Sequence, residues 1–200
     1  MKNPEIAWDT SLQIQTAGRD DTGADQYHHP YEPTPYSVLE RLAGSGLISK
    51  DDVVLDYGCG KGRVSFFLTN QTKARTIGIE YDSRIYERAL ENQETARSKA
   101  AFVLTRAEEY EVPMEVNRCY FFNPFSVEIL QKVMARIIES YYDHPREIFL
   151  FFYYPSDEYI AHLMTVDELD FYDEIECDDL FEGRDSRERI MIFRFPDYET

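Results

Sequence analysis

Short apolar runs alternate along this chain with longer segments in which apolar residues recur at helical spacing. The strongest periodic segment places Leu130, Val133, Met134, Ile137, Ile138 and Tyr141 at i, i+3, i+4, i+7, i+8 and i+11, the pattern of an amphipathic helix. Further helices are predicted at Arg63–Thr69 and Asp157–Met164. Ser83 is predicted to cap a helix that runs to about Ala96, and Thr34 to cap a helix that Gly44 or Gly46 ends. Apolar runs predict buried strands at Val53–Tyr57, Thr76–Glu80, Phe102–Leu104, Tyr120–Phe122 and Ile148–Tyr154.

The end of the chain departs from this alternation. Phe171–Cys177 and Ile190–Phe195 read as two strands joined by a polar turn around Gly183, with no helix between them. Strands joined this way pair as an antiparallel hairpin. The whole pattern predicts an α/β fold with a doubly wound, mostly parallel seven-stranded sheet and an antiparallel edge hairpin.

Length and composition predict one folded domain with a separate N-terminal part. The 200 residues include 28 Tyr and Phe, enough to build a core, and no low-complexity linker interrupts them. Residues 1 to about 30 are polar and weakly periodic, which predicts a loose extension. We therefore expect residues 1–33 to form an extension and a possible lid, and residues 34–200 to form the domain.

Charge narrows the classes of partner. The net charge is −17, a field that repels phosphate backbones and anionic membranes, so nucleic acid is a disfavoured partner. Residues 151–200 hold 15 Asp and Glu against 4 Arg, a net of −11. This acidic region is either a solvated face or a surface for a basic substrate or partner.

The spacing of the cysteines and the hydropathy of the chain indicate the cellular compartment of the protein. Cys59, Cys119 and Cys177 are widely spaced and form no C-x-x-C pair, which is typical of a reduced, cytoplasmic protein. The first residues have no apolar signal core, and no apolar stretch approaches the roughly 20 residues of a membrane span. The adjacent His28 and His29 have no accompanying cluster of ligands, so no metal site is predicted.

The sequence D-Y-G-C-G-K-G follows the first predicted strand, with Gly58, Gly60 and Gly62 at alternating positions. Three ligand classes compete for such a loop. A nucleoside triphosphate requires G-x-x-x-x-G-K-[ST], which is absent, and a dinucleotide requires G-x-G-x-x-G, whose last glycine is replaced here by Arg63. The remaining class is a ligand without phosphate.

Asp56 and this loop resemble motif I of the class I S-adenosylmethionine-dependent methyltransferases. Glu80, 24 residues after Asp56, matches that family's acidic residue for the ribose hydroxyls, and the terminal hairpin matches its edge strands. The resemblance extends from about Thr34 to Phe195. It implies strand order 3-2-1-4-5-7-6 and S-adenosyl-L-methionine as cofactor. The cofactor-binding residues that it implies are Asp56, Gly58, Cys59, Gly60, Gly62, Glu80, Tyr81, Ala107, Glu108 and Asn123.

The resemblance gives these residues different parts of the cofactor. Asp56 and the glycine backbone would hold the amino-acid part, whose carboxylate takes N–H donors or a cation such as Lys61 or Arg63. On the adenine side, Arg106 stands where the family commonly has an aspartate. Glu108 or the backbone N–H of Ala107 is then the expected adenine contact, with a solvent-facing turn as the alternative for Glu108.

The sequence Asn123-Pro124-Phe125 ends the fourth predicted strand and resembles a shortened N-P-P-Y motif of the amino methyltransferases. The resemblance implies Asn123 and Phe125 as catalytic candidates beside the transferred methyl. The missing second proline places specificity for a nucleobase in doubt. The alternative is an ordinary strand-ending turn.

Aromatic residues supply the candidates for the acceptor side. Tyr27, Tyr31 and Tyr36 are expected to line a lid over the site, and Tyr153 to form part of the substrate wall. The alternative is ordinary packing of an extended aromatic segment. No residue stands out as a general base, and His28, Glu108 or a tyrosine could serve.

The function expected from the resemblance is methyl transfer from S-adenosylmethionine to a small molecule or a protein side chain. The alternative is a methyltransferase-like module that binds the cofactor or a nucleoside without catalysis and acts through a protein partner. A nicotinamide oxidoreductase is a third reading, which Arg63 disfavours. The sequence leaves the acceptor and the oligomeric state open.

Overall fold

Seven strands form one mixed sheet in the order β3-β2-β1-β4-β5-β7-β6. The computed structural model describes residues 3–22 and 26–196, so the parts of the two predicted domains that fall on residues 1–2, 23–25 and 197–200 lie outside it. The strands are β1 (Val53–Tyr57), β2 (Arg75–Glu80), β3 (Ala101–Leu104), β4 (Arg118–Phe121), β5 (Ile148–Tyr153), β6 (Asp170–Glu176) and β7 (Arg189–Phe195).

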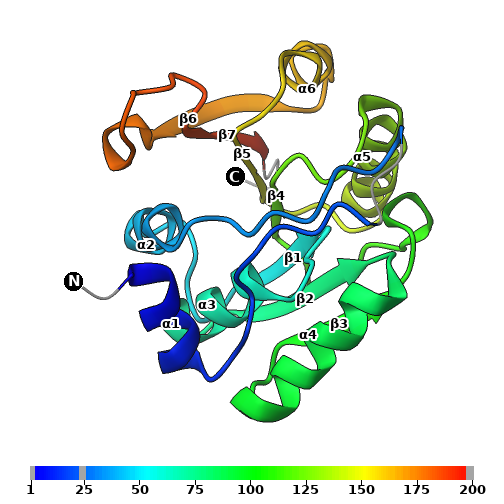
Figure 1. Cartoon of the computed structure of the whole chain (residues 1–200). Helices are drawn as coiled ribbons and strands as arrows, with labels where there is room; N and C mark the ends of the chain where they lie inside the picture. Colours follow the sequence, from blue (N-terminus) through cyan, green and yellow to red (C-terminus); the bar gives the residue numbers. More distant parts are fainter. Residues whose placement is uncertain (1–2, 23–25, 197–200) are drawn as a thin grey trace.

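Helices cover both faces of this sheet. Figure 1 shows α1, α2 and α3 gathered on one side and α5 on the other. Two apolar cores result, one between the sheet and α2 and α3, the other between the sheet and α5. The helices are α1 (Pro4–Leu12), α2 (Tyr36–Gly44), α3 (Arg63–Thr72), α4 (Ser83–Ala96), α5 (Val127–Asp143) and α6 (Asp157–Leu163), with short 3₁₀ turns η1 (Ala107–Glu109) and η2 (Asp178–Leu180).

The predicted fold class and strand order are confirmed. β1, β2, β3, β4 and β5 pair in parallel, while β7 pairs antiparallel with both β5 and β6. β1 and β5 are buried along their whole length, as their continuous apolar sequences require. β6 is the exposed edge, and a register shift between Phe171 and Asp173 interrupts its pairing.

Two predicted helix caps are corrected. Pro35 occupies the N-cap of α2 and makes no side-chain cap bond. The Thr34 hydroxyl instead lies 3.0 Å from the Tyr120 hydroxyl, in the interior. At α4 the cap is Asp82, whose carboxylate accepts the N–H of Arg84 at 2.9 Å, rather than Ser83. In both cases the capping signal lies one residue from the true cap.

The prediction of a loose N-terminal extension is wrong for the described residues. α1 packs on α2 and α3, and Leu12 and Ile14 are buried in the core. The Trp8 ring lies edge-on to Phe67 at 4.9 Å. After α1 the chain crosses the carboxyl ends of the central strands toward α5 and returns to α2, as Figure 1 shows. Residues 18–22 and 26–33 of this crossing are called the strap below.

Arg63 joins the N-terminal part to the domain. Its side chain is only 3% exposed and forms an ion pair with Glu5, with Asp9 at 3.7 Å. It also donates to the Thr16 hydroxyl at 2.7 Å and to the Thr34 carbonyl at 3.1 Å. Because an unpaired buried charge is costly, this one guanidinium holds α1, the segment after it and the start of α2 together.

We predict that Arg63→Met destabilises the protein by about 3 to 5 kcal/mol, because Glu5 and Asp9 lose their buried counter-charge. Urea unfolding of the two proteins measures the difference. The matched control is Arg75→Met, whose side chain is 67% exposed and, among the described residues, pairs with Glu115 alone. Its expected cost is below about 0.5 kcal/mol. Equal costs at the two positions would contradict the role given to Arg63.

Candidate active site

A hollow opens at the carboxyl ends of β1, β2 and β4, beneath the strap. β1 pairs with β2 on one side and β4 on the other, so the strand order reverses here, where ligands bind in sheets of this kind. The hollow is partly open to solvent and is lined by residues of the strap, of the glycine loop and of the ends of these strands.

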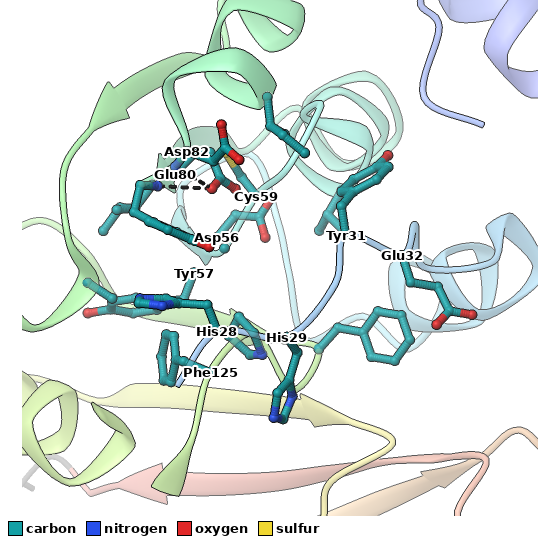
Figure 2. A pocket seen from close by; sticks show the side chains of 18 of the residues that line it. His28, His29, Tyr31, Glu32, Asp56, Tyr57, Cys59, Glu80, Asp82 and Phe125 are labelled. Atoms are coloured by element: carbon teal, nitrogen blue, oxygen red, sulfur yellow. Dashed lines mark hydrogen bonds between the residues drawn. The ribbon is translucent and has the colours of Figure 1, made fainter. Parts of the chain in front are cut away.

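Glu80 sits at the end of β2 and accepts three backbone N–H groups. One carboxylate oxygen accepts from Gly60 at 3.0 Å, and the other accepts from Tyr81 and Asp82, each at 2.9 Å. Figure 2 shows Glu80 and Asp82 side by side at one end of the hollow. Since an ionised carboxylate has about four acceptor positions, Glu80 keeps room for about one more donor.

Asp56 is 2% exposed and lies one residue before the end of β1, beside the glycine loop. Burial raises its pKa to about 7; the Ser65 hydroxyl, which donates to Asp56 at 2.9 Å, acts against this shift, and the nearby Glu80 adds to it. Burial also raises the pKa of Glu80. Two carboxyl groups in one buried site without a cation on either of them suit a ligand that brings a positive charge.

The glycine loop is covered by two side chains of the protein itself. A Cβ on Gly60, where φ is +57°, would overlap the ring of Tyr31, and a Cβ on Gly58 would overlap Pro124. The Tyr31 hydroxyl donates to the Thr16 carbonyl at 2.6 Å, and Lys61 lies 4.7 Å from the centre of its ring. The alternating glycines thus let the strap and the turn after β4 pack directly on the loop.

The strap is bonded to the turn that follows β4. The N–H of His29 donates to the Pro124 carbonyl at 3.2 Å, and the N–H of Ser126 donates to the Tyr27 carbonyl at 2.7 Å. The His28 ring stacks on Tyr81, with 3.9 Å between ring centres. The strap therefore spans the hollow from the β2 end to the β4 end.

Asn123 is used differently from its predicted role. Its amide donates to the Tyr154 carbonyl, and its side-chain oxygen accepts the N–H of Ser156 at 3.3 Å. Its backbone is left-handed, with φ of +38°. Asn123 thus fastens the end of β4 to the end of β5 and is not among the residues that line the hollow, which does not support its predicted catalytic and cofactor-binding roles.

The other predicted residues divide into those at the hollow and those away from it. The hollow is lined by Asp56, Gly58, Cys59, Glu80, Tyr81, Ala107, Glu108, Phe125 and Tyr31. Phe125 is 3% exposed and lies edge-on to Phe121. At Cys59, burial raises the pKa of the thiol well above its ordinary value. Cys59 is therefore a packing residue rather than a nucleophile.

Tyr36 and Tyr153 do not line the hollow, which corrects their predicted place in the lid and the substrate wall. Tyr36 is fully buried, and its hydroxyl donates to Asp9 at 2.6 Å. Tyr153 is 2% exposed, and its hydroxyl donates to Glu188 of the terminal hairpin. Tyr27 is 45% exposed and is not among the lining residues, and its carbonyl accepts the N–H of Ser126 at the turn after β4.

Several residues that line the hollow were not predicted as site residues, among them Asp82 and His29. Asp82 directly follows the Glu80–Tyr81 pair, so an acid at the start of the next helix was the available signal. Pro124 and His29 meet only because the strap crosses the sheet, a long-range contact that no local pattern encodes. Among the described residues, no three His, Cys, Asp or Glu side chains gather as a metal site requires.

Comparisons with known proteins show which proteins share the sequence pattern and the fold described above. Residues 54–144 match the family described as a methyltransferase domain. An RNA methyltransferase from Salinibacter ruber, solved with S-adenosyl-L-homocysteine, has the same fold. Its TM-score is 0.55 at 19% identity, over 84% of this chain and 95% of that one. Residues 54–144 are thus similar to a methyltransferase domain, and the described residues share the fold of that RNA methyltransferase.

Two further proteins resemble this chain, one in structure and one in sequence. A dimethyladenosine transferase from Plasmodium falciparum superposes with a TM-score of 0.55 at 14% identity, over 83% of this chain and 63% of that one. A protein-lysine N-methyltransferase of Saccharolobus islandicus is 35% identical over 68 residues, which are 34% of this chain and 42% of the relative. The match thus spans less than half the length of that relative.

We predict that Gly60→Ala destabilises the protein more than Gly183→Ala does. Both glycines have positive φ, but a Cβ on Gly183 meets no atom within 4 Å. Gly183→Ala should therefore carry only the backbone cost of about 1 to 2 kcal/mol. Thermal or urea unfolding measures both.

The cause is tested in a Tyr31→Ala background. If the Tyr31 ring is what Gly60 accommodates, removing the ring should bring the cost of Gly60→Ala down to that of Gly183→Ala. An unchanged cost in that background would show that the strap does not pack on the loop.

Proposed function

We propose that this chain binds S-adenosyl-L-methionine in the hollow and transfers its methyl group to an amine of a protein side chain. The observation that carries the proposal is the pair Asp56 and Glu80, two buried carboxyl groups joined through the glycine loop. The fold and the matched methyltransferase domain support the same assignment.

The residues present fit this cofactor. Asp56 is a buried acceptor for the ammonium of its amino-acid part, and Glu80, with Asp82 beside it, is an acceptor for ribose hydroxyls. Ala107 and Glu108 begin the 3₁₀ turn after β3 and border the adenine side. When bound, the cofactor supplies a methyl group already activated on a sulfonium, so the protein has to align the acceptor and exclude water.

Neither Lys61 nor Arg63 fits the expected contact with the cofactor carboxylate. Arg63 is fully engaged with the N-terminal part, and Lys61 donates to the Ala17 carbonyl at 3.2 Å. We therefore assign the carboxylate to backbone N–H groups at the start of α3, where the helix dipole favours negative charge.

An amine of a protein is the acceptor that charge supports best. Six carboxyl groups line the hollow, namely Asp20, Glu32, Asp56, Glu80, Asp82 and Glu108, and the one Arg or Lys among the lining residues, Arg63, is neutralised by Glu5 and Asp9. The chain as a whole carries −17. These charges attract a cationic amine and repel nucleic acid. The named activity of the Saccharolobus relative points the same way.

The strap acts as a lid in this proposal. The ring centres of His28 and Tyr81 are 3.9 Å apart, which leaves no space for the adenine ring of the cofactor between them. The Tyr31 ring lies on Gly60. The strap therefore moves outward for the cofactor to reach the loop and closes again over it. Within the described residues no helix is both long and apolar enough to cross a membrane. We place the protein in the cytoplasm on its three unpaired, buried cysteines.

We predict that Asp56→Asn weakens binding of S-adenosylmethionine by about 10- to 100-fold, because a hydrogen bond to a charged group contributes roughly 1.5 to 3 kcal/mol. Isothermal titration calorimetry measures the affinity. Asp51→Asn, at an exposed acid just before the same strand, is the matched control and should bind like the wild type. A wild type that binds no cofactor would refute the proposal, and binding without transfer to any basic protein would favour the non-catalytic module.

The same site predicts a pH dependence of binding. The pKa of Asp56 in the free protein is about 7, and the ammonium of the cofactor favours the ionised carboxylate. Below pH 7 a proton must leave before binding, so affinity should fall about tenfold from pH 8 to pH 6. Calorimetry at pH 6 in buffers of different ionisation enthalpy should show close to one proton released. Affinity that does not change with pH would contradict Asp56 as the ammonium site.

A further inference from the structure

Two buried hydroxyl groups meet at the wall of the hollow. The hydroxyl oxygens of Thr34 and Tyr120 lie 3.0 Å apart, both residues are almost fully buried, and both line the hollow. Each hydroxyl carries one hydrogen, and one of these two hydrogens lies in the bond between the oxygens. The other hydrogen has no acceptor among the described residues. Because a buried donor without an acceptor is costly, the pair is suited to a ligand that brings an acceptor.

Tyr120 lies beside Asp56. β1 and β4 pair in parallel with Asp56 opposite Tyr120, so the two side chains leave the sheet on the same face. That face carries α2 and α3: Asp56 accepts the Ser65 hydroxyl of α3, and Tyr120 belongs to the core on this side. The spare hydrogen of the hydroxyl pair is therefore available next to the carboxylate to which we assign the ammonium of the cofactor.

Tyr120 stays protonated in this position. Burial raises the pKa of its hydroxyl well above the ordinary value; the bond to Thr34 acts against this shift, and the charge of Asp56 adds to it. The pair consequently keeps both of its hydrogens at neutral pH and acts as a neutral donor. A neutral donor next to Asp56 can bind a carboxylate without cancelling the negative charge that attracts the ammonium.

The two basic side chains of the glycine loop are already used. The guanidinium of Arg63 pairs with two acids of α1 and donates to the Thr34 carbonyl at 3.1 Å, and Lys61 donates to the Ala17 carbonyl at 3.2 Å. Neither is left to neutralise a carboxylate, which must then be held by neutral donors. The same bond from Arg63 fixes the backbone of Thr34 directly after the strap, so the hydroxyl pair keeps its place when the strap moves.

We propose that the Thr34–Tyr120 pair donates its spare hydrogen to the carboxylate of the cofactor's amino-acid part, together with the backbone N–H groups at the start of α3. The carboxylate and the ammonium of that part are attached to the same carbon atom, so an ammonium on Asp56 brings the carboxylate to the neighbouring donors. A carboxylate has about four acceptor positions, enough for hydroxyl and backbone donors together. The pair thus selects a ligand that carries a carboxylate. This inference rests on the proposed function.

The test compares two ligands that differ in the carboxylate alone, S-adenosylmethionine and decarboxylated S-adenosylmethionine. The double variant Thr34→Val/Tyr120→Phe removes both hydroxyls and little volume. It should bind S-adenosylmethionine about 10-fold more weakly or worse, because a hydrogen bond to a charged group is lost. Its affinity for the decarboxylated ligand should not fall. Isothermal titration calorimetry measures all four affinities and needs no methyl transfer.

The single variants identify the donor. Whichever of Thr34→Val and Tyr120→Phe removes the hydroxyl that donates to the ligand should show the larger loss for S-adenosylmethionine. They also carry the test if the double variant does not fold, because at least one of them must show a loss confined to the ligand with the carboxylate. The matched control is Tyr141→Phe. Tyr141 is equally buried, but its hydroxyl donates to the Pro196 carbonyl at 2.8 Å in the core on the α5 side, so this variant should bind both ligands like the wild type.

The outcomes separate this inference from the proposed function. A wild type that binds neither ligand would refute both. A wild type that binds S-adenosylmethionine, with the same fold-loss for both ligands in the hydroxyl variants, would overturn the inference and leave the proposed function standing, because the hydroxyls would then only shape the hollow. Unchanged affinity for S-adenosylmethionine in these variants would also overturn the inference alone.

Discussion

The neutralisation of one buried charge organises the N-terminal half of this molecule. Arg63 begins the helix that follows the glycine loop and is almost fully enclosed. Its counter-charges come from α1, in Glu5 and Asp9, and its remaining bonds go to residues on either side of the strap. The strap is thereby held at both ends and must pass over the carboxyl ends of the strands.

The chemistry of the hollow follows from this enclosure. Glu80 is satisfied by three backbone N–H groups, so it shapes the loop that Asp56 lies beneath. Asp56 accepts hydrogen bonds from Ser65, and burial raises its pKa to about 7. A cationic ligand stabilises the ionised form of Asp56, because its positive charge offsets the loss of solvation on burial. The same acidic lining then acts on the acceptor, which is why an amine fits better than a phosphate-rich partner.

Most of the fold could be predicted from the spacing of apolar residues along the chain. The strands were placed within two residues because β1 and β5 are continuous apolar runs, and the edge hairpin follows from the missing helix between its strands. The glycine loop and Glu80 were found because their chemistry is local to a strand end. Such signals depend on neighbours in the sequence, so they can be read without the structure.

The side-chain roles that could not be predicted from the sequence depend on partners far away in the chain. Arg63 was expected to face a cofactor, yet its partners lie up to 58 residues away. Asn123 was expected to meet the acceptor, but its amide bonds the end of β5. Tyr36 and Tyr153 are aromatic residues near site segments, and both turned inward because acids of other elements accept their hydroxyls. The helical nature of α1 was missed because few apolar residues mark it and its packing surface comes from α2 and α3.

The most direct measurement of the central claim is a crystal structure of the protein with S-adenosyl-L-homocysteine bound. We expect the ammonium of the ligand on Asp56, its ribose on Glu80, its carboxylate on the backbone at the start of α3, and the strap displaced from Tyr81. A ligand bound elsewhere, or a ligand in the hollow with neither Asp56 nor Glu80 in contact, would contradict the account.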